Sequence, residues 1–157
     1  MSAKTLGRLL RRKGLTVAIA ESCTGGKVGD LITDVPGSSD YFLGGVISYS
    51  NDAKISVLGV DRSVLRAKGA VSEEVALQMA SGARKRLKTD IGLSTTGIAG
   101  PTGGTAQKPV GLVYIAVSSS AGQKVSRNLF KGSRSAIKAK SAQKALELLE
   151  EFVASTP

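Results

Sequence analysis

The sequence predicts an α/β domain, a three-layer α/β/α sandwich in which helices cover both faces of a mixed, mostly parallel sheet. Its 157 residues suit one domain with its own core, so we expect residues 1–157 to form a single domain. Apolar runs of strand length alternate with amphipathic segments of helical period, which is typical of βαβ units. Near the C-terminal end two strand-like segments follow one another directly, which predicts a hairpin and therefore a mixed sheet.

The first half of the chain alternates between the two periodicities. Leu6, Leu9 and Leu10 recur at helical spacing among basic residues, and Gly14 suits the end of that helix. Asn51 is a good helix cap after a strand-like run. The elements expected here are a helix at 3–13, a strand at 15–20, a helix at 27–33, a strand at 41–49, a helix from Asn51 to about Leu58 and a short helical turn at 62–67.

The second half begins with the strongest helix signal. Ser72 precedes two glutamates that suit the positive end of a helix dipole, and basic residues follow near the expected helix end. Ser133 is a similar cap for the last helix. The elements expected here are a helix from Ser72 to about Lys88, a strand at 90–97, a loop at 98–109 rich in glycine, proline and threonine, hairpin strands at 110–118 and 124–130, and a helix from Ser133 to about Val153.

The chain has no histidine and one cysteine. This composition excludes Ser-His-Asp and Cys-His catalysis and almost every zinc site built from histidine and cysteine. Any nucleophile therefore needs another base, for which Lys, Tyr, Asp and Glu are the candidates, and a partly desolvated lysine can serve because burial lowers its pKa. A single cysteine forms no internal disulfide, and no signal peptide or membrane-spanning run is apparent, so we expect a cytoplasmic protein that does not enter a membrane.

The net charge is +10, and the segment from Lys124 to Lys144 holds seven basic residues and no acidic residue. Such a segment is most often a solvated helix face, although it also suits an anionic small molecule or nucleic acid. Three Phe, three Tyr and no Trp leave few aromatic platforms for single-stranded nucleic acid. A nucleic-acid partner is therefore disfavoured but not excluded.

Three segments leave the ends of predicted strands, at 21–26, 49–54 and 97–105. Ligands of open α/β sheets bind beyond the carboxyl ends of the strands, so these segments predict a site. In the first, Gly25 and Gly26 allow backbone amides to approach an anion or oxyanion beside Ser22 or Cys23. Taken alone, the same segment is more typical of an ordinary strand-to-helix turn.

The other two segments offer a base and a ligand-binding loop. Lys54 is expected in the first turn of a helix, where the dipole would lower its pKa; the alternative is an exposed surface lysine. A long glycine-rich and threonine-rich loop inside a compact domain is more often functional than idle. Its candidate contacts to a phosphate or sugar are Thr96, Gly97, Gly103, Gly104 and Thr105.

Several strings together resemble the CinA C-terminal-domain family, which is known as nicotinamide mononucleotide (NMN) amidohydrolase. The strings are Ala20-Glu-Ser-Cys-Thr-Gly-Gly26, Val46-Ile-Ser-Tyr-Ser-Asn-Asp-Ala-Lys54, Gly69-Ala-Val-Ser-Glu-Glu-Val-Ala76, Thr96-Gly-Ile-Ala-Gly-Pro101 and Lys108-Pro-Val-Gly111. The resemblance implies a three-layer α/β/α fold, a homo-oligomer, and hydrolysis of a pyridine nucleotide carboxamide without metal or cofactor. Larger CinA proteins carry a further domain in front, for which we expect no room here.

The resemblance also implies residue roles. Ser22 would be the nucleophile and Lys54 its base, with Tyr49 nearby, and backbone amides at Cys23, Thr24, Gly25 and Gly26 would hold the oxyanion. Arg134 would contact the phosphate or ribose. The sequence departs from the family where Ser133 replaces a frequent acidic residue and Lys138 replaces a second arginine, which puts substrate preference in doubt.

Three rival hypotheses remain open from sequence. Cys23 is a second candidate nucleophile, because a thiolate is more reactive than a serine hydroxyl, although a small buried residue is the commoner role. A non-catalytic nucleotide-binding or nucleic-acid-binding module would use the basic residues at 124–144. A purely structural or interaction protein is the third, and the glycine loops at strand ends disfavour it.

Overall fold

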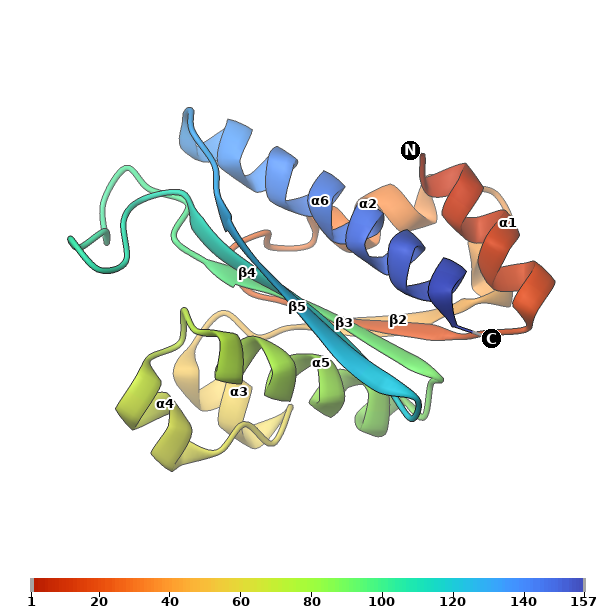
Figure 1. Ribbon diagram of the computed structural model, residues 1–157, viewed down its shortest axis with the longest axis horizontal. Helices are drawn as coiled ribbons and strands as arrows, with labels where there is room; N and C mark the ends of the chain where they lie inside the picture. Colours follow the sequence, from red (N-terminus) through yellow and green to blue (C-terminus); the bar gives the residue numbers. More distant parts are fainter. Residues whose placement is uncertain (1, 157) are drawn as a thin grey trace.

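The computed structural model describes residues 2–156 and has three layers (Figure 1). Within this range five strands form one sheet in the order β2-β1-β3-β4-β5. Strand β1 is parallel to β2 and β3, while β4 is antiparallel to both of its neighbours, so β4 opposes the direction of the other four. The predicted α/β fold is confirmed. The strands are β1 Val17–Glu21, β2 Phe42–Ile47, β3 Ile91–Gly97, β4 Leu112–Ser119 and β5 Gly122–Leu129.

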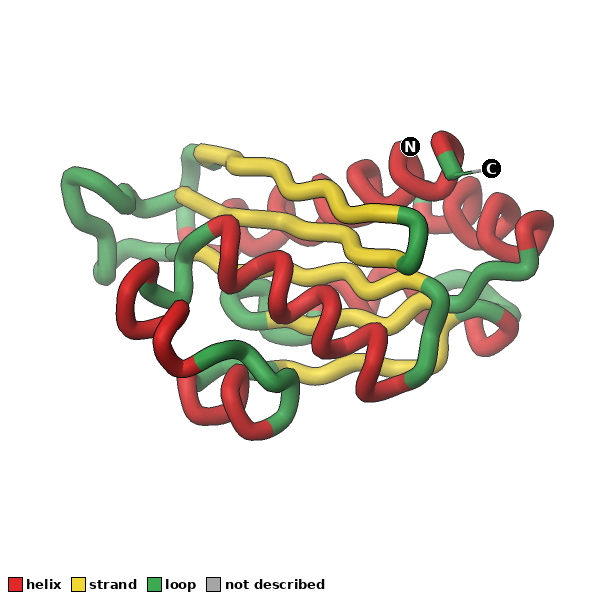
Figure 2. The backbone as a smooth tube through the Cα atoms, turned by 60° about the horizontal axis from the view of Figure 1, so that its bottom comes forward, coloured by secondary structure: helices red, strands yellow, loops and turns green. Residues whose placement is uncertain are grey.

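Helices cover both faces of the sheet. On one face lie α1 Ala3–Lys13, α2 Lys27–Thr33 and α6 Arg134–Ser155 (Figure 1). On the other side lie α3 Asn51–Ser56, α4 Arg62–Lys68 and α5 Glu73–Leu87, and Figure 2 shows α5 crossing the strands. A 3-10 turn, Ser38–Asp40, precedes β2. The caps predicted at Ser72 and Ser133 are confirmed, because each side chain accepts a backbone N–H of the following helix.

The two faces of the sheet are packed differently. The α1, α2 and α6 face is filled by large aliphatic side chains such as Leu10, Ile32 and Leu149. On the other face α5 lies close to the sheet because the facing residues are small. An added Cβ on Gly92 of β3 would lie 1.9 Å from the carbonyl oxygen of Ala80 in α5. This close contact holds α5 against the first residues of β3.

Some predicted boundaries are wrong by one or a few residues. The first strand begins at Val17 rather than 15, because Thr16 instead bonds the carboxylate of Asp90 through both its backbone N–H and its hydroxyl. The cap of α3 is Ser50, not Asn51, since the Ser50 hydroxyl accepts the N–H of Ala53. The hairpin turn is shorter than predicted, because the two strands remain paired as far as Ser119 and Gly122.

Substitution Gly92→Ala is expected to destabilise the domain by about 3 kcal/mol or more, because the methyl group has no space beside the α5 backbone. Chemical denaturation of the purified variant measures this change. Gly59→Ala is the comparison: its Cβ meets nothing within 4 Å, so only its positive φ of 71° is penalised, by about 1 kcal/mol. Equal losses in the two variants would show that close helix-sheet packing is not the cause.

Candidate active site

Ser22 lies directly after β1 at the carboxyl edge of the sheet. Its backbone N–H donates to the carbonyl of Thr95, 3.0 Å away, and the N–H of Ser48 donates to the carbonyl of Glu21 at 2.8 Å. Backbone hydrogen bonding to the chains of β2 and β3 therefore continues to the end of β1 and one residue beyond it. These contacts hold Ser22 between the chain that leaves β2 and the last residues of β3.

Lys54 reaches Ser22 from α3 through the interior. Its Nζ lies 3.0 Å from Ser22 Oγ, 2.8 Å from the carbonyl oxygen of Ser48 and 3.4 Å from that of Tyr49. The side chain is 1% exposed, so the alternative of a surface lysine is wrong. When the amine is neutral, the two carbonyls can accept its two hydrogens and leave its lone pair toward the Ser22 hydroxyl. The arrangement is therefore able to take a proton from Ser22.

Burial lowers the pKa of Lys54 from its ordinary value of 10.5. The sequence expectation that Lys54 lies in the first turn of a helix is wrong, because it lies in the last turn of α3, which has only six residues. The side chain forms no ion pair within residues 2–156 that would favour its charged form. The uncharged form of Lys54 is therefore more populated near neutral pH than that of a lysine in water.

Cys23 is buried, and its environment suppresses the thiolate. Burial, with a smaller contribution from the Glu21 carboxylate, raises the pKa of the thiol to about 12. A thiol with this pKa is a poor nucleophile, because the thiolate is the reactive species. The structure therefore disfavours Cys23 as the reacting group and agrees with the role of a small buried residue.

Ser22 and Lys54 open into a cavity of about 270 Å³. The predicted residues that line it are Ser22, Cys23, Tyr49, Lys54, Thr96, Gly97, Gly103 and Arg134. Sequence reasoning from chemistry missed Asn51, Ala70, Val71, Ile98, Ala99 and Gly100. Most of these are apolar or glycine and carry no chemical signal of their own. Four of them lie within the segments 49–54 and 97–105 predicted to leave strand ends, whereas Ala70 and Val71 were indicated only by a string shared with the family.

Five predicted residues do not line this cavity: Thr24, Gly25, Gly26, Gly104 and Thr105. Thr24 is fully buried, and its hydroxyl donates to the carboxylate of Glu21. The N–H of Gly25 donates to the carbonyl of Ser22, and Gly26 is the cap residue of α2. Thr105 closes a turn with Lys108 through its backbone N–H and its hydroxyl oxygen. Local hydrogen bonds thus occupy groups that sequence alone offered to a ligand.

Thr96 lines the cavity, but its hydroxyl is already engaged. It donates to the carbonyl of Ala70 at 2.8 Å. Thr96 therefore holds the segment of Ala70 and Val71, which forms one wall of the cavity. This is a positioning role in the unliganded site, in contrast to the direct substrate contact expected from sequence.

Arg134 connects two of the loops at the mouth of the cavity. Its guanidinium donates to the carbonyl of Gly100 at 2.8 Å and to the hydroxyl of Tyr49 at 3.0 Å. Tyr49 itself is 62% exposed. In Figure 1 the loop that carries Gly100 extends beyond the end of the sheet, on the side where α6 begins. Arg134 thus ties that loop to the chain leaving β2.

The part of the chain that the structure describes shows no group of three or more Cys, Asp or Glu side chains able to hold a metal ion. None of its helices is both long enough and apolar enough to cross a membrane. The polar side chains that line the cavity include the hydroxyl of Ser22, the amine of Lys54 and the guanidinium of Arg134.

Comparison with known proteins identifies the family. The model of the CinA C-terminal domain matches residues 1–153. The chain belongs to the CinA C-terminal-domain family. A CinA-like protein of Geotalea uraniireducens is 51% identical over 147 residues, which is 94% of this chain and 35% of that protein. A CinA-like protein of Cyanothece sp. is 60% identical over 120 residues, 76% of this chain and 29% of that protein.

Solved CinA-family structures share this fold. The crystal structure of the competence/damage inducible protein CihA from Agrobacterium tumefaciens matches with a TM-score of 0.93 at 39% identity, over 98% of this chain and 93% of that one. A CinA superfamily protein from Escherichia coli matches with a TM-score of 0.91 at 31% identity, over 95% and 87%. Because this chain spans only about a third of the length of its CinA-like relatives, their names describe much longer proteins.

The lowered pKa of Lys54 predicts how stability changes with pH. In the unfolded chain this lysine keeps a proton up to about pH 10.5, whereas the folded chain releases it earlier, so the cost of burying the charged amine disappears as pH rises toward 10.5. The free energy of unfolding of the wild type minus that of Lys54→Met should therefore increase between pH 7 and pH 10. Denaturant titrations of both proteins measure this difference, in which other titrating groups cancel. A difference that does not change with pH would mean that the pKa is not lowered.

Proposed function

We propose that this CinA-family chain hydrolyses the carboxamide of NMN to nicotinate mononucleotide and ammonia. The observation that supports it most is the 3.0 Å contact between Lys54 Nζ and Ser22 Oγ at a cavity. A buried lysine beside a serine can activate it without histidine. The chain's lack of histidine makes this one of few routes open to a serine nucleophile.

The reaction would proceed in two halves. Neutral Lys54 takes the proton of Ser22 while Oγ bonds to the carboxamide carbon, and the carbonyl π electrons move to oxygen. The oxyanion collapses, the C–N bond breaks, and Lys54 returns the proton to the departing ammonia. Water then attacks the ester and gives one proton to Lys54, the bond between the acyl carbon and Oγ breaks as Lys54 returns that proton to Ser22, and the product leaves as the acid. The net change consumes one water and releases ammonia and the acid.

The oxyanion needs donors next to the nucleophile. We assign this role first to the backbone N–H of Cys23, which follows Ser22 directly and lines the cavity. The N–H of Gly25 is less suited, because it already donates to the carbonyl of Ser22 at 3.2 Å. The family resemblance implies the whole segment from Cys23 through Gly26, and the position of Cys23 at the cavity supports the choice of its N–H.

The two halves of NMN would bind at different walls. Ala70, Val71 and Ala99 offer an apolar wall to the pyridine ring. Arg134 at the start of α6 offers charged N–H donors to the phosphate, near the positive end of a 22-residue helix. Lys138 lies one turn further, and its Nζ would be 3.6 Å from a Cβ placed on Gly25. Arg134 and Lys138 are thus the cations that we propose for binding the phosphate.

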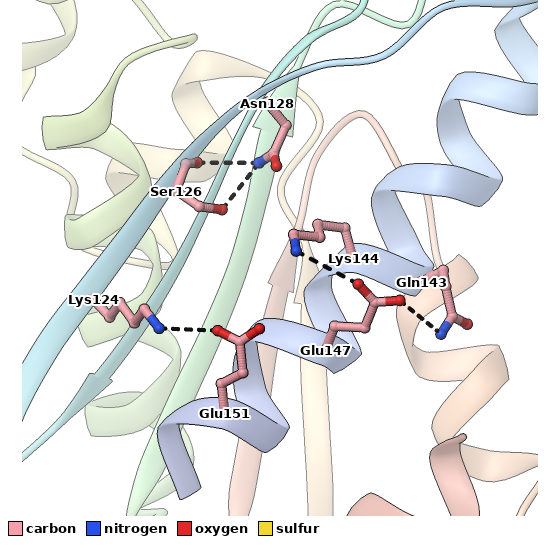
Figure 3. Close-up of polar contacts among 7 residues, drawn as sticks. All are labelled: Lys124, Ser126, Asn128, Gln143, Lys144, Glu147 and Glu151. Atoms are coloured by element: carbon pink, nitrogen blue, oxygen red, sulfur yellow. Dashed lines mark hydrogen bonds and ion pairs between the residues drawn. The ribbon is translucent and has the colours of Figure 1, made fainter. Parts of the chain in front are cut away.

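The alternative is a non-catalytic module that binds nucleotides or nucleic acid through residues 124–144. Figure 3 shows that Lys124 and Lys144, at the two ends of that segment, pair with Glu151 and Glu147 of α6 at 3.0 and 3.5 Å. The basic residues are also divided between β5 and α6. Because two of these lysines are paired with glutamates and the basic residues are divided between two elements, they form a less continuous basic surface. We therefore prefer the amidohydrolase function. We place its activity in the cytoplasm, because a lone unpaired thiol suits a reducing compartment.

The direct test is incubation of the purified protein with NMN in the presence of a chelator, with ammonia and nicotinate mononucleotide measured. We expect both products in equal amounts, and kcat/KM should rise with pH through a pKa below 10.5 as Lys54 loses its proton. Ser22→Ala and Lys54→Ala should each lower kcat by about a thousandfold or more, since they remove parts of one catalytic unit.

Cys23→Ala is the matched control in the adjacent position and should retain most of the activity. Activity that survives Ser22→Ala but not Cys23→Ala would overturn the assignment of the nucleophile. A wild type as inert as Lys54→Ala, together with salt-sensitive retention on nucleic acid, would favour the binding module instead.

We also propose that the chain self-associates through β2, as the resemblance to an oligomeric family suggests. Among residues 2–156 the exposed large hydrophobic side chains are Leu43, Ile47, Tyr49 and Leu129, and three of these four lie in or just after this edge strand. The opposite edge strand, β5, carries Lys124 and Arg127, which discourage edge pairing. Strand β2 has no charged residue.

The charges of α2 favour a second copy as the occupant. Helix α2 runs alongside β2. The start of the helix, at Gly26 and Lys27, lies near Ile47, and Asp34 marks its other end. A two-fold axis through the middle of β2 would bring Lys27 of one copy toward the partner subunit's Asp34. Such a dimer would also cover Ile47 and approach Tyr49 at the mouth of the cavity.

Sedimentation analysis at micromolar concentration tests this interface. We expect the wild type and Leu129→Asp to be dimers or larger, and Ile47→Asp to be a monomer, because a buried unpaired charge is costly. Both substitutions place a charge on an exposed hydrophobic residue of an edge strand, so they are matched. A monomeric wild type, or an Ile47→Asp variant that assembles normally, would refute the interface.

A further inference from the structure

The residue before the proposed nucleophile, Glu21, has a buried carboxylate. It is the last residue of β1 and is 2% exposed. Within residues 2–156 no lysine or arginine lies within ion-pair distance of it. A buried carboxylate without a cation is costly unless several donors bind it, so its partners indicate what it does for the molecule.

All three donors to Glu21 come from residues that follow Ser22. Oε1 accepts the hydroxyl of Thr24 at 2.5 Å and the N–H of Val28 at 3.0 Å, and Oε2 accepts the N–H of Gly29 at 3.1 Å. The cap residue of α2, Gly26, has a φ of 108° and no side chain to serve these amides. Glu21 therefore replaces the ordinary cap and closes residues 22–29 into one hydrogen-bonded loop.

A second contact ties this loop to β3. The single hydroxyl hydrogen of Thr24 is used on Glu21, so the hydroxyl of Thr95 donates to Thr24 Oγ1, 2.7 Å away. The backbone carbonyl of the same Thr95 accepts the N–H of Ser22 at 3.0 Å. Ser22 is thus held by Thr95 through its own backbone and, two residues later, through Thr24 and Glu21.

We propose that Glu21 is a positioning residue for the Ser22 and Lys54 pair: its carboxylate holds the loop so that Ser22 Oγ stays within hydrogen-bonding distance of Lys54 Nζ. Glu21 does not line the cavity and lies instead beside the groove between α2 and β2, so it acts through the loop and does not touch substrate. This inference rests on the proposed serine-lysine chemistry. The same carboxylate also contributes to the raised pKa of Cys23, which keeps the neighbouring thiol unreactive.

Substitution Glu21→Gln tests the proposal. The glutamine keeps the size and the oxygen that accepts from Thr24 and Val28, but its NH2 group would face the N–H of Gly29, so a donor opposes a donor. We expect kcat for NMN to fall by about tenfold or more while KM changes by less than about threefold, because chemistry depends on the alignment of Ser22 and Lys54, whereas Glu21 has no hydrogen bond to Arg134 or to the apolar wall proposed to bind substrate.

The matched control is Glu150→Gln, at another buried glutamate that is 8% exposed. It lies roughly four turns further along α6 than Arg134, far from the cavity. We expect kcat unchanged in this variant. Wild-type kcat in Glu21→Gln, or a loss that merely follows the unfolded fraction measured by circular dichroism, would overturn the proposal.

A second variant covers the case in which Glu21→Gln fails to fold. Thr24→Val keeps the shape of the side chain and removes the hydroxyl that donates to Glu21. It should show the same loss in kcat at nearly constant KM, and the double variant should be no worse than Glu21→Gln alone, because both act through one contact. A folded Thr24→Val with full kcat would contradict the role of Glu21.

A readout that does not depend on NMN separates this inference from the proposed function. A small aryl sulfonyl fluoride should label Ser22: Oγ bonds to sulfur, fluoride leaves, and the proton passes to Lys54. Mass spectrometry measures the rate, which should be about tenfold lower or more in Glu21→Gln and wild-type in Glu150→Gln. If NMN is not hydrolysed but labelling follows this pattern, the substrate is wrong and the role of Glu21 stands. If Glu21→Gln is labelled at the wild-type rate, Glu21 is not a positioning residue.

Discussion

The buried amine of Lys54 is the group on which the rest of the site depends. Removing an amine from water is costly, and here the cost is offset by the carbonyls of Ser48 and Tyr49 and by the hydroxyl of Ser22. Those two carbonyls lie where they do because the N–H of Ser48 pairs with the carbonyl of Glu21, which continues the ladder between β2 and β1. The register of two parallel strands therefore determines whether a lysine can be neutral beside a serine.

Strand direction explains why distant segments meet at this edge. Strands β1, β2, β3 and β5 run the same way, so the residues that follow each of them emerge at one side of the sheet. Ser22 follows β1, Tyr49 follows β2, Gly100 follows β3, and Arg134 follows β5 at the start of α6. The antiparallel β4 is what returns the chain so that β5 can deliver Arg134 to the same place. A fully alternating hairpin arrangement would have separated these groups.

Several buried polar groups around the cavity support other residues and are not themselves aimed at a ligand. Thr96 binds the carbonyl of Ala70, and Thr24 binds Glu21. Each donates to a buried or partly buried acceptor, and each holds a loop next to the cavity. The site is therefore preorganised by hydroxyl groups behind the loops, with the hydroxyl of Ser22 and the amine of Lys54 in front of them.

Short-range information determined the elements and the type of chemistry. Periodicity and caps predicted the helices and strands to within a few residues, because these signals lie inside each segment, as at Ser72 and Ser133. The absence of histidine, a property of composition alone, already required a base of another type, with lysine among the candidates. Only the tertiary structure decided that Lys54 is buried beside Ser22, that Thr24 turns inward, and that Glu21 supports the loop. Ser22 and Lys54 are 32 residues apart, and Thr24 and Thr95 are 71 apart. Burial and long-range contacts of this kind depend on how β1, β2 and β3 are paired, which no local pattern contains.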